Sequence, residues 1–213
     1  MVAPSDNWID ELSRDSLPLT AEGVVIDIGT GDGLFVYQSA RQNPKKFYIG
    51  IDTNVRPLKK VSEKIHRKPA KGGAPNVLFV NAAVEDLPVE LDGIADEVHV
   101  HFPWGSLLRA VASGEVSTLK NIRRICAADA LLEVVIGSDP ERDQGELERL
   151  GLEPITIEFI DEVLAHRYCN AGFRIAERGI LLADEWPEFK TSWGRRLKGN
   201  QSRSLVYLIA RAV

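Results

Sequence analysis

Apolar residues recur along this chain at two different spacings, and the two kinds of segment alternate. Short runs rich in β-branched residues are typical of buried strands, whereas longer segments with apolar residues every three or four positions are typical of helices. From position 24 onward the two kinds of segment follow one another, which indicates parallel strands joined by crossover helices. The strands are predicted at Val24–Ile28, Phe47–Ile51, Val77–Asn81, Glu97–Phe102, Leu131–Ile136, Phe173–Leu182 and Leu205–Ala210.

Helical segments occupy the intervals between these strands. They are predicted at Leu34–Arg41, Arg56–Arg67, Thr118–Ile125, Glu141–Leu150 and Ile160–Ala171, and another is expected to begin near Trp186. Residues 1–22 show no strong strand pattern and contain one short possible helix near Trp8. The pattern therefore predicts a single α/β domain over residues 23–213, preceded by an N-terminal extension, residues 1–22, to which no structure is assigned.

The composition is typical of one soluble globular domain. Of the 213 residues, 44% are hydrophobic and 27% are charged, which is enough apolar surface to bury a full core. No apolar run approaches the roughly 20 residues that cross a bilayer, and the first residues lack a signal-peptide layout, so we expect a cytoplasmic protein with no membrane partner. Cys126 and Cys169 stand far apart without metal-ligand spacing. They are interpreted as small core residues, and no metal is expected.

Three glycines at every second position follow the first predicted strand and precede the first predicted helix. Such a loop allows a sharp turn and opens onto a helix N-terminus, where unpaired N–H groups favour negative charge. The dinucleotide fingerprint G-x-G-x-x-G would need glycine at position 34, which is leucine. The pattern D-x-G-x-G-x-G is met instead by Asp27, Gly29, Gly31 and Gly33, with Thr30 inside the loop. This resembles motif I of class I S-adenosylmethionine (SAM) methyltransferases, although a glycine loop alone could also be a purely structural turn.

Acidic residues near two later strand ends extend this interpretation. Asp52 ends the second predicted strand about 20 residues beyond the glycine loop, the spacing at which an acidic residue binds ribose hydroxyls in Rossmann-type units. Its alternative role is an N-cap of the next helix. The third strand leads into small residues that include Ala83, against which the adenine ring of SAM could lie. Glu85 beside it could accept a hydrogen bond from the exocyclic amine, or it could be a solvated loop charge.

Phe-Pro-Trp-Gly, residues 102–105, follows the fourth predicted strand, where class I methyltransferases carry the motif that faces the methyl group. Together with the following Ser-Leu-Leu, it resembles the 16S rRNA (adenine 1408-N1) methyltransferases of the NpmA/KamB aminoglycoside-resistance group. The similarity also includes residues 68–73, 82–88 and 191–197. It runs colinearly over about residues 23–210.

The resemblance implies a fold, a cosubstrate and a pair of base-binding residues. The fold would be a seven-stranded, mostly parallel sheet with helices on both faces and an antiparallel last strand. SAM would be the methyl donor, with Ser106 and Thr191 in its pocket. Trp104 and Trp193 would stack on either face of a flipped adenine. From the residues alone, Trp104 could equally plug the end of the sheet. For Trp193, which lies in an apolar helical stripe, the residues alone favour core packing.

Methylation at adenine N1 requires no general base, because the neutral ring carries an in-plane lone pair on that atom. We therefore expect the reaction to depend on positioning of the base and the methyl group. His99 and His101 lie close to the Phe-Pro-Trp-Gly motif. They are not assigned as bases, since a strand histidine is more often an ordinary core or surface residue.

Basic residues gather in two clusters, although the formal charge of −5 argues against a generally basic nucleic-acid coat. Either cluster alone could be a solvated helix face, but two together favour contact with RNA phosphates. The resemblance implies 16S rRNA in the 30S subunit as the partner, no binding to DNA, and resistance to kanamycin and apramycin. A monomer is the simplest expectation for a substrate as large as the 30S subunit. The open alternatives are another RNA such as tRNA, or a weakly active SAM- or RNA-binding homologue. The candidate RNA-binding residues are Lys64, Arg67, Lys68, Lys71, Arg196 and Arg203.

Overall fold

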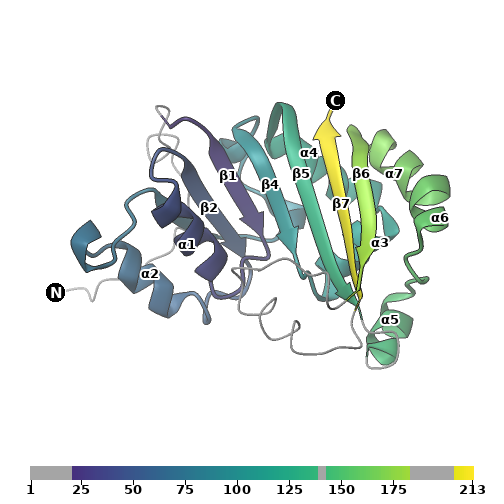
Figure 1. The fold of residues 1–213 in the computed structure, drawn as a ribbon, viewed down its shortest axis with the longest axis horizontal. Helices are drawn as coiled ribbons and strands as arrows, with labels where there is room; N and C mark the ends of the chain where they lie inside the picture. Colours follow the sequence, from purple (N-terminus) through teal and green to yellow (C-terminus); the bar gives the residue numbers. More distant parts are fainter. Residues whose placement is uncertain (1–20, 139–142, 183–203) are drawn as a thin grey trace.

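A mixed seven-stranded sheet forms the centre of the chain (Figure 1). The computed structural model describes residues 21–138, 143–182 and 204–213. The strands are β1 (Val24–Ile28), β2 (Phe47–Asp52), β3 (Val77–Asn81), β4 (Ala95–His101), β5 (Cys126–Ser138), β6 (Phe173–Leu181) and β7 (Ser204–Ala212). They lie in the order β3-β2-β1-β4-β5-β7-β6. Because β7 runs antiparallel to both β5 and β6 while the pairs from β3 to β5 are parallel, the predicted fold class is confirmed.

Helices and single helical turns connect the strands. The segment formed by α6 (Ile157–Phe159), η5 (Ile160–Leu164) and α7 (Ala165–Asn170) is one continuous helix with a π-helical centre. Three short 3₁₀ turns, η2 (Pro69–Lys71), η3 (Val84–Asp86) and η4 (Val89–Leu91), lie in the connections around β3. The remaining helical elements are α1 (Leu34–Gln42), α2 (Lys59–Ile65), α3 (Gly105–Ser113), α4 (Val116–Ile125) and α5 (Gln144–Leu150).

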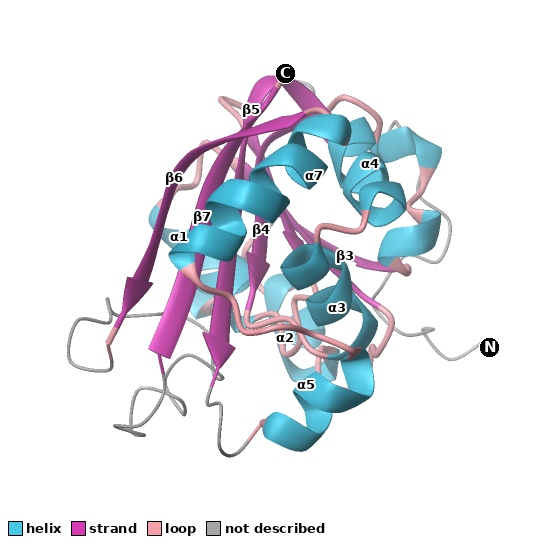
Figure 2. Cartoon of the chain, turned by 90° about the vertical axis from the view of Figure 1, so that its right-hand side faces the viewer, coloured by secondary structure: helices cyan, strands magenta, loops and turns pink. Residues whose placement is uncertain are grey.

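Helices cover both faces of the sheet (Figure 2), and alternating strand residues divide the apolar core between these two faces. Val25 and Phe79 lie on the face covered by α1 and α2, where they pack in one cluster with Val36. Ile26 and Val98 lie on the opposite face, within a larger cluster to which α3, α4 and α7 contribute. The helices therefore cover both faces, as the sequence pattern predicts.

Helix α3 is absent from the elements predicted above. It begins at Gly105, directly after Trp104, whose extended backbone occupies the N-cap position. The buried residues Leu108 and Val111 are three positions apart and mark its inward face. Phe-Pro-Trp-Gly is interpreted above only as a turn, and the helical spacing of the apolar residues that follow it is not considered there.

Several predicted boundaries also move, and for the starts of β5 and α2 the structure shows the reason. β5 begins at Cys126 rather than Leu131, because Cys126 pairs with Ala95 of β4. Residues 127–130 carry no strand pattern and lie at an irregularity in the register, which resumes where Leu131 pairs with Glu97. α2 begins after residues 55–58, because these form a turn closed by a hydrogen bond from Leu58 N–H to the Val55 carbonyl at 3.1 Å.

Cys126 is buried as predicted, but Cys169 is exposed, so its interpretation as a core residue is wrong. The fully buried Tyr168 is the inward-facing residue at this point of α7, which leaves the next position toward solvent. Among the described residues, no helix is both long and apolar enough to cross a membrane. Residues 1–20 of the predicted extension and the helix predicted near Trp186 lie outside the described residues.

The order of connections around β1 places a crevice at the carboxyl edge of the sheet. From β1 the chain passes outward to β2 and β3, then returns to form β4 on the other side of β1. Ligands of open α/β sheets bind outside the carboxyl ends of the strands at such a switch point. The glycine loop, residues 29–33, and the Phe-Pro-Trp-Gly turn, residues 102–105, both emerge there.

Candidate active site

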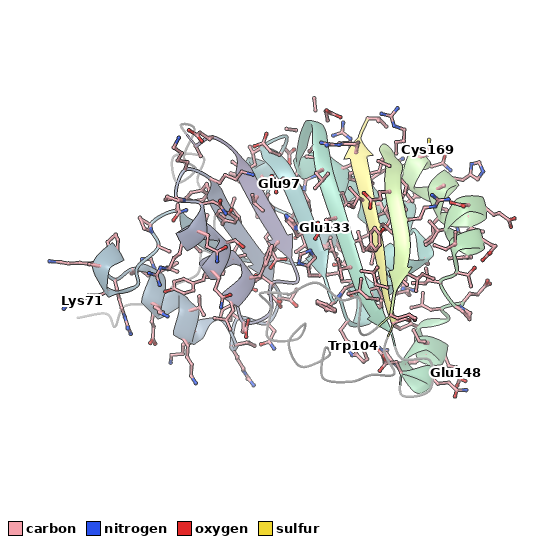
Figure 3. All side chains as sticks on the ribbon, in the orientation of Figure 1. Lys71, Glu97, Trp104, Glu133, Glu148 and Cys169 are labelled. Atoms are coloured by element: carbon pink, nitrogen blue, oxygen red, sulfur yellow. The ribbon has the colours of Figure 1, made fainter. Side chains whose placement is uncertain are left out.

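A cavity of about 390 Å³ lies at this carboxyl edge. Its volume falls in the range of about 300–1,000 Å³ that is typical of small-molecule pockets. The segments that follow β1, β2, β3 and β4 all contribute to its lining. Figure 3 places Trp104 at the same edge. The structure brings together many of the predicted site residues here, namely Asp27, Gly29, Thr30, Gly31, Asp52, Glu85, Trp104 and Ser106.

Gly31 and Gly33 show why the first loop needs glycine. Both have positive φ, 60° and 70°, a conformation that other residues rarely adopt. A Cβ on Gly33 would lie 2.7 Å from the Phe79 ring, so this residue is needed for the turn and does not line the cavity. A Cβ on Gly31 would meet nothing within 4 Å, because this glycine faces open space. A ligand could therefore approach the backbone at Gly31.

Asp52 fixes the position of the glycine loop. Its Oδ2 accepts a hydrogen bond from Gly31 N–H at 2.8 Å, and its Oδ1 accepts one from Asn54 N–H at 2.8 Å. The alternative role as an N-cap is wrong, since α2 begins at Lys59 and has Leu58 at its N-cap position. Each carboxylate oxygen retains acceptor capacity for a ligand hydroxyl.

The cavity lining is acidic. Its carboxylates belong to Asp27, Asp32, Asp52 and Glu85. Burial raises the pKa of Asp27, and the neighbouring His101 opposes that shift. A lining of this kind favours a ligand with positive charge, because opposite charges attract strongly in a site partly shielded from water.

The third strand contributes less than the pattern predicts. Ala83 does not line the cavity, whereas its neighbours Ala82 and Val84 do. Ala83 still has extended backbone, so the alternation of the strand places its two neighbours at the cavity, and the turn η3 that begins at Val84 brings Glu85 there as well. Glu85 is exposed yet lines the cavity, which leaves both of its predicted roles open.

The turn after β4 exposes Trp104. The Phe102 backbone has a φ of 50°, and its N–H donates to the Val135 carbonyl at 2.7 Å. The Trp104 side chain is 59% exposed, which is inconsistent with a buried plug for the sheet end. It also borders a second cavity of about 130 Å³, lined largely by apolar residues such as Leu108 and Leu147. One face of a flat ligand could therefore rest on this indole.

The first basic cluster, residues 59–71, comprises α2 and the turn that follows it, and it is held against α1. Lys64 Nζ lies 4.5 Å from the centre of the Tyr37 ring, and Tyr37 Oη donates to the Gly72 carbonyl at 2.8 Å. A Cβ on Gly73 would lie 1.6 Å from the Arg67 carbonyl oxygen, so this turn requires glycine. The predicted residues Arg67, Lys68 and Lys71 are exposed, and Lys64 is half-buried.

Part of the predicted site cannot be placed. Trp193, Thr191, Arg196 and Arg203 lie outside the described residues. Among the cavity residues that the sequence analysis does not assign are Thr53, Asn54, His101 and Leu107. For His101 the usable signal is its position at the carboxyl end of β4, since side chains there face the switch-point crevice.

His99 lies two residues before His101 and contacts two acidic side chains. Burial alone would lower the pKa of His99, but hydrogen bonds to Glu133 and Glu97 outweigh burial and raise the pKa to about 9. The bond to His99, assisted by Lys46, lowers the pKa of Glu97 to about 2. Hydrogen bonds from the two histidines also lower the pKa of Glu133.

The strand order, the glycine loop after β1 and the acidic residue that ends β2 define a class I SAM-dependent methyltransferase fold. The family model described as NpmA: 16S rRNA (adenine(1408)-N(1))-methyltransferase matches residues 9–212, and the chain belongs to this family.

Individual relatives agree with this assignment. The 16S rRNA (adenine(1408)-N(1))-methyltransferase of Streptoalloteichus hindustanus is 37% identical over 194 residues, covering 91% of this chain and 88% of the relative. The crystal structure of the aminoglycoside resistance methyltransferase NpmB1 is 44% identical, with a TM-score of 0.81 over 95% of each chain. A mutant of the 16S rRNA (adenine(1408)-N(1))-methyltransferase from Catenulisporales acidiphilia, crystallised with cosubstrate SAM, is 32% identical. It has a TM-score of 0.86 and covers 98% of this chain and 95% of that chain.

Proposed function

We propose that this chain transfers a methyl group from SAM to N1 of adenine 1408 in the 16S rRNA of the 30S subunit and thereby confers resistance to kanamycin and apramycin. The observation that carries the proposal is the exposed Trp104 beside an acidic glycine-loop cavity at the switch point of the sheet. Membership of the family supports the choice of target atom. We further propose that residues 23–213 act as one catalytic domain, in a cytoplasmic monomer.

The residues around the cavity fit SAM. SAM carries an ammonium and a sulfonium group, which suit a lining that contains four carboxylates. Asp52 is our proposed ligand for the ribose hydroxyls, and the segment that contains Ala83 and Glu85 would hold the adenine. Ser106 and Thr191 are proposed as further contacts, while Asp27, Gly29, Thr30, Gly31 and Gly33 form and support the loop. Bound SAM supplies an electrophilic methyl group.

The tryptophans position the target base in this proposal. Adenine 1408 must leave its stack before N1 is accessible, and aromatic faces on both sides would hold it. Trp104 supplies one face from the turn after β4, and Trp193 is proposed to supply the other. No side chain needs to remove a proton, because N1 attacks with its own lone pair. Aromatic faces also tolerate the positive charge that the methylated base acquires.

Methylation of purified 30S subunits tests the proposal directly. With tritiated SAM, we expect methyl incorporation and a primer-extension stop caused by the modified adenine 1408. Subunits with guanine at position 1408 are the matched control and should accept no methyl group there. Incorporation into tRNA in place of 30S subunits, or no incorporation at all, would contradict the proposal. A susceptible bacterium that expresses the chain should grow on both kanamycin and apramycin.

Gly31→Ala is expected to weaken SAM binding at least tenfold. The new methyl group would occupy open space at the glycine loop, and the positive φ adds strain of about 1–2 kcal/mol. Gly93→Ala is the matched control, since Gly93 has a φ of 70° and its Cβ would also meet nothing within 4 Å, but it lies away from the cavity. Calorimetry with SAM and thermal melting of both variants would separate the two effects. Equal losses of SAM affinity would mean that backbone strain alone is responsible.

Replacing Lys68 and Lys71 together by alanine is expected to raise the KM for 30S subunits several-fold without changing kcat or SAM affinity. Each lost phosphate contact should reduce the slope of log affinity against log salt by about 1. The paired replacement of Lys45 and Lys120 removes the same charge from exposed positions elsewhere. Steady-state kinetics over a salt series would measure both pairs. Equal changes in KM would indicate a general charge effect instead of this loop.

A further inference from the structure

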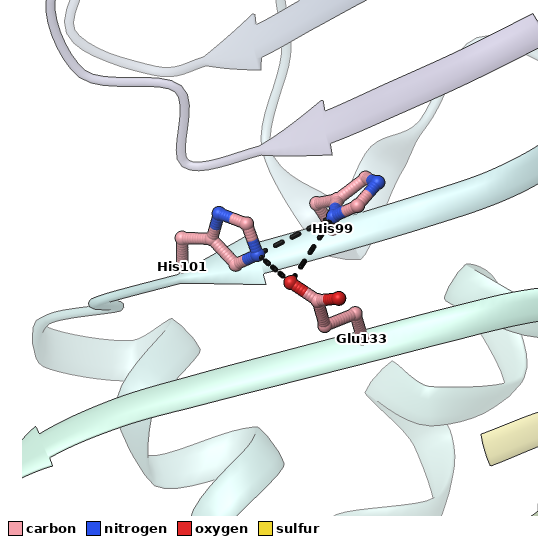
Figure 4. Close-up of side chains that lie close together, drawn as sticks. All are labelled: His99, His101 and Glu133. Carbon is pink, nitrogen blue, oxygen red and sulfur yellow. Dashed lines mark hydrogen bonds and ion pairs between the residues drawn. The ribbon is translucent and has the colours of Figure 1, made fainter. Parts of the chain in front are cut away.

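Two imidazoles and one carboxylate meet on the face of the sheet that α1 covers (Figure 4). His99 and His101 are two residues apart on β4 and therefore share a face. Glu133 lies on β5 directly opposite His99 in the strand register. His99 Nδ1 is 3.3 Å from His101 Nε2 and 3.5 Å from Glu133 Oε1, and the latter oxygen is 2.5 Å from His101 Nε2.

The cluster is shielded from water. The side chains of His99 and His101 are 11% and 5% exposed, and Glu133 is 30% exposed. The Phe35 ring of α1 lies over both imidazoles, with its centre 5.2 Å and 4.9 Å from theirs. One atom from each of the three side chains could bind a metal ion, and these atoms all lie within 4.8 Å of one another. No other group of three or more histidine, cysteine or acidic side chains meets this criterion among the described residues.

The surroundings of the cluster contain more carboxylates than ammonium groups. Asp27 pairs with His99 in the register of β1 and β4, and Glu97 Oε2 lies 3.6 Å from His99 Nε2. Lys46 forms an ion pair with Glu97 at 2.6 Å. With Glu133 included, three acidic side chains lie near one ammonium, and such surroundings favour a bound cation.

We propose that His99 Nδ1, His101 Nε2 and Glu133 Oε1 bind a divalent transition-metal ion, with Zn²⁺ as the best match. Zinc is held by imidazole and carboxylate ligands at about 2.0–2.2 Å, which in tetrahedral geometry separates the ligand atoms by roughly 3.3–3.5 Å. Two of the three separations already have this size. The third requires a shift of the partly exposed Glu133 side chain. Calcium and magnesium prefer all-oxygen sites and fit less well.

The ion would join β4 to β5 beside the cosubstrate cavity, since His101 also lines that cavity. From the sequence no metal is expected, because only the spacing of the cysteines is considered. The proposed ligands are instead two histidines of one strand and a glutamate 32 residues beyond His101. Metal binding does not depend on the identity of the RNA substrate. The site can therefore be tested separately from the methyl transfer.

Cobalt titration of the untagged, chelator-treated full chain tests the site. Co²⁺ is expected to bind in a 1:1 ratio with visible d–d absorption typical of four or five ligands, and Zn²⁺ should displace it and raise the melting temperature. His101→Gln and Glu133→Gln should each weaken binding more than tenfold. His66→Asn is the matched control, because His66 is an exposed histidine outside the cluster.

Three results would overturn the proposal. Absence of stoichiometric Co²⁺ binding by the wild-type chain would mean that hydrogen bonds alone hold the cluster together, and this result does not depend on any variant folding. Equal binding by the cluster variants and His66→Asn would place the ion elsewhere. Thiolate charge-transfer bands that disappear in Cys169→Ser would assign the ion to the exposed cysteine. Melting curves of each variant would verify that it is folded.

Discussion

Trp104→Ala is expected to lower the rate of 30S methylation roughly 5- to 150-fold. The estimate follows from the loss of one stacking face, which is worth about 1–3 kcal/mol per base. The indole is 59% exposed, so its removal should leave the free energy of unfolding within about 0.5 kcal/mol of the wild type. SAM affinity should change little, because the carboxylates and the glycine loop remain. Single-turnover methylation at saturating SAM would measure the effect on the step that positions the base.

Two control variants separate the loss of aromatic stacking from the general loss of an exposed apolar side chain. Trp104→Phe retains an aromatic face and should keep most of the rate. Val89→Ala removes an even more exposed apolar side chain, 66% exposed, that does not line the cavity, and it should have no effect. A loss of SAM affinity as large as the loss of rate would show that Trp104 serves the cosubstrate instead. An unchanged rate would show that the target base rests elsewhere.

The fold can be predicted from the sequence wherever the apolar residues of a segment keep the spacing typical of either a strand or a helix. β1 is apolar except for Asp27, and β2 is apolar apart from Gly50 and its final Asp52, so their positions could be predicted closely. The amino-terminal part of β5 contains Asp129, whose φ is 59°, and a segment of this kind has no strand pattern of its own. It is attached to the sheet through the pairing of Cys126 with Ala95 of β4, and pairing between distant strands is not encoded in local spacing.

The candidate site shows the same division between local and distant information. Gly31 could be predicted because it belongs to the glycine motif, and Asp52 because it ends a strand at the known spacing from that motif. Their contact, the hydrogen bond from Gly31 N–H to Asp52, depends on β1 and β2 lying side by side. Glu133 could not be linked to His101 from the sequence, because the two meet only through the pairing of β4 and β5. Strand pairing therefore determines which of the predicted residues act together.

Asp52→Ala is expected to weaken SAM binding roughly 10- to 150-fold. A hydrogen bond to a charged group contributes about 1.5–3 kcal/mol, and this substitution removes the proposed acceptor for the ribose hydroxyls. It also leaves the N–H groups of Gly31 and Asn54 without their acceptor, so the glycine loop loses the contact that positions it. Asp52→Asn keeps one acceptor oxygen and should be affected less than alanine. Calorimetric titration of SAM into each variant would measure the difference.

Asp96→Ala is the matched control for this last prediction. Asp96 Oδ2 also accepts a backbone hydrogen bond, from Val24 N–H at 2.8 Å, but at the opposite, amino-terminal edge of the sheet. Its loss should lower the melting temperature without changing SAM affinity, because that edge is far from the cavity along β1 and β4. If the two variants weaken SAM binding equally, the effect arises from general loosening of the sheet. If only Asp52→Ala weakens SAM binding, the Asp52 carboxylate contributes directly to SAM affinity. Both variants lose a hydrogen bond to the backbone, but only Asp52 borders the cavity.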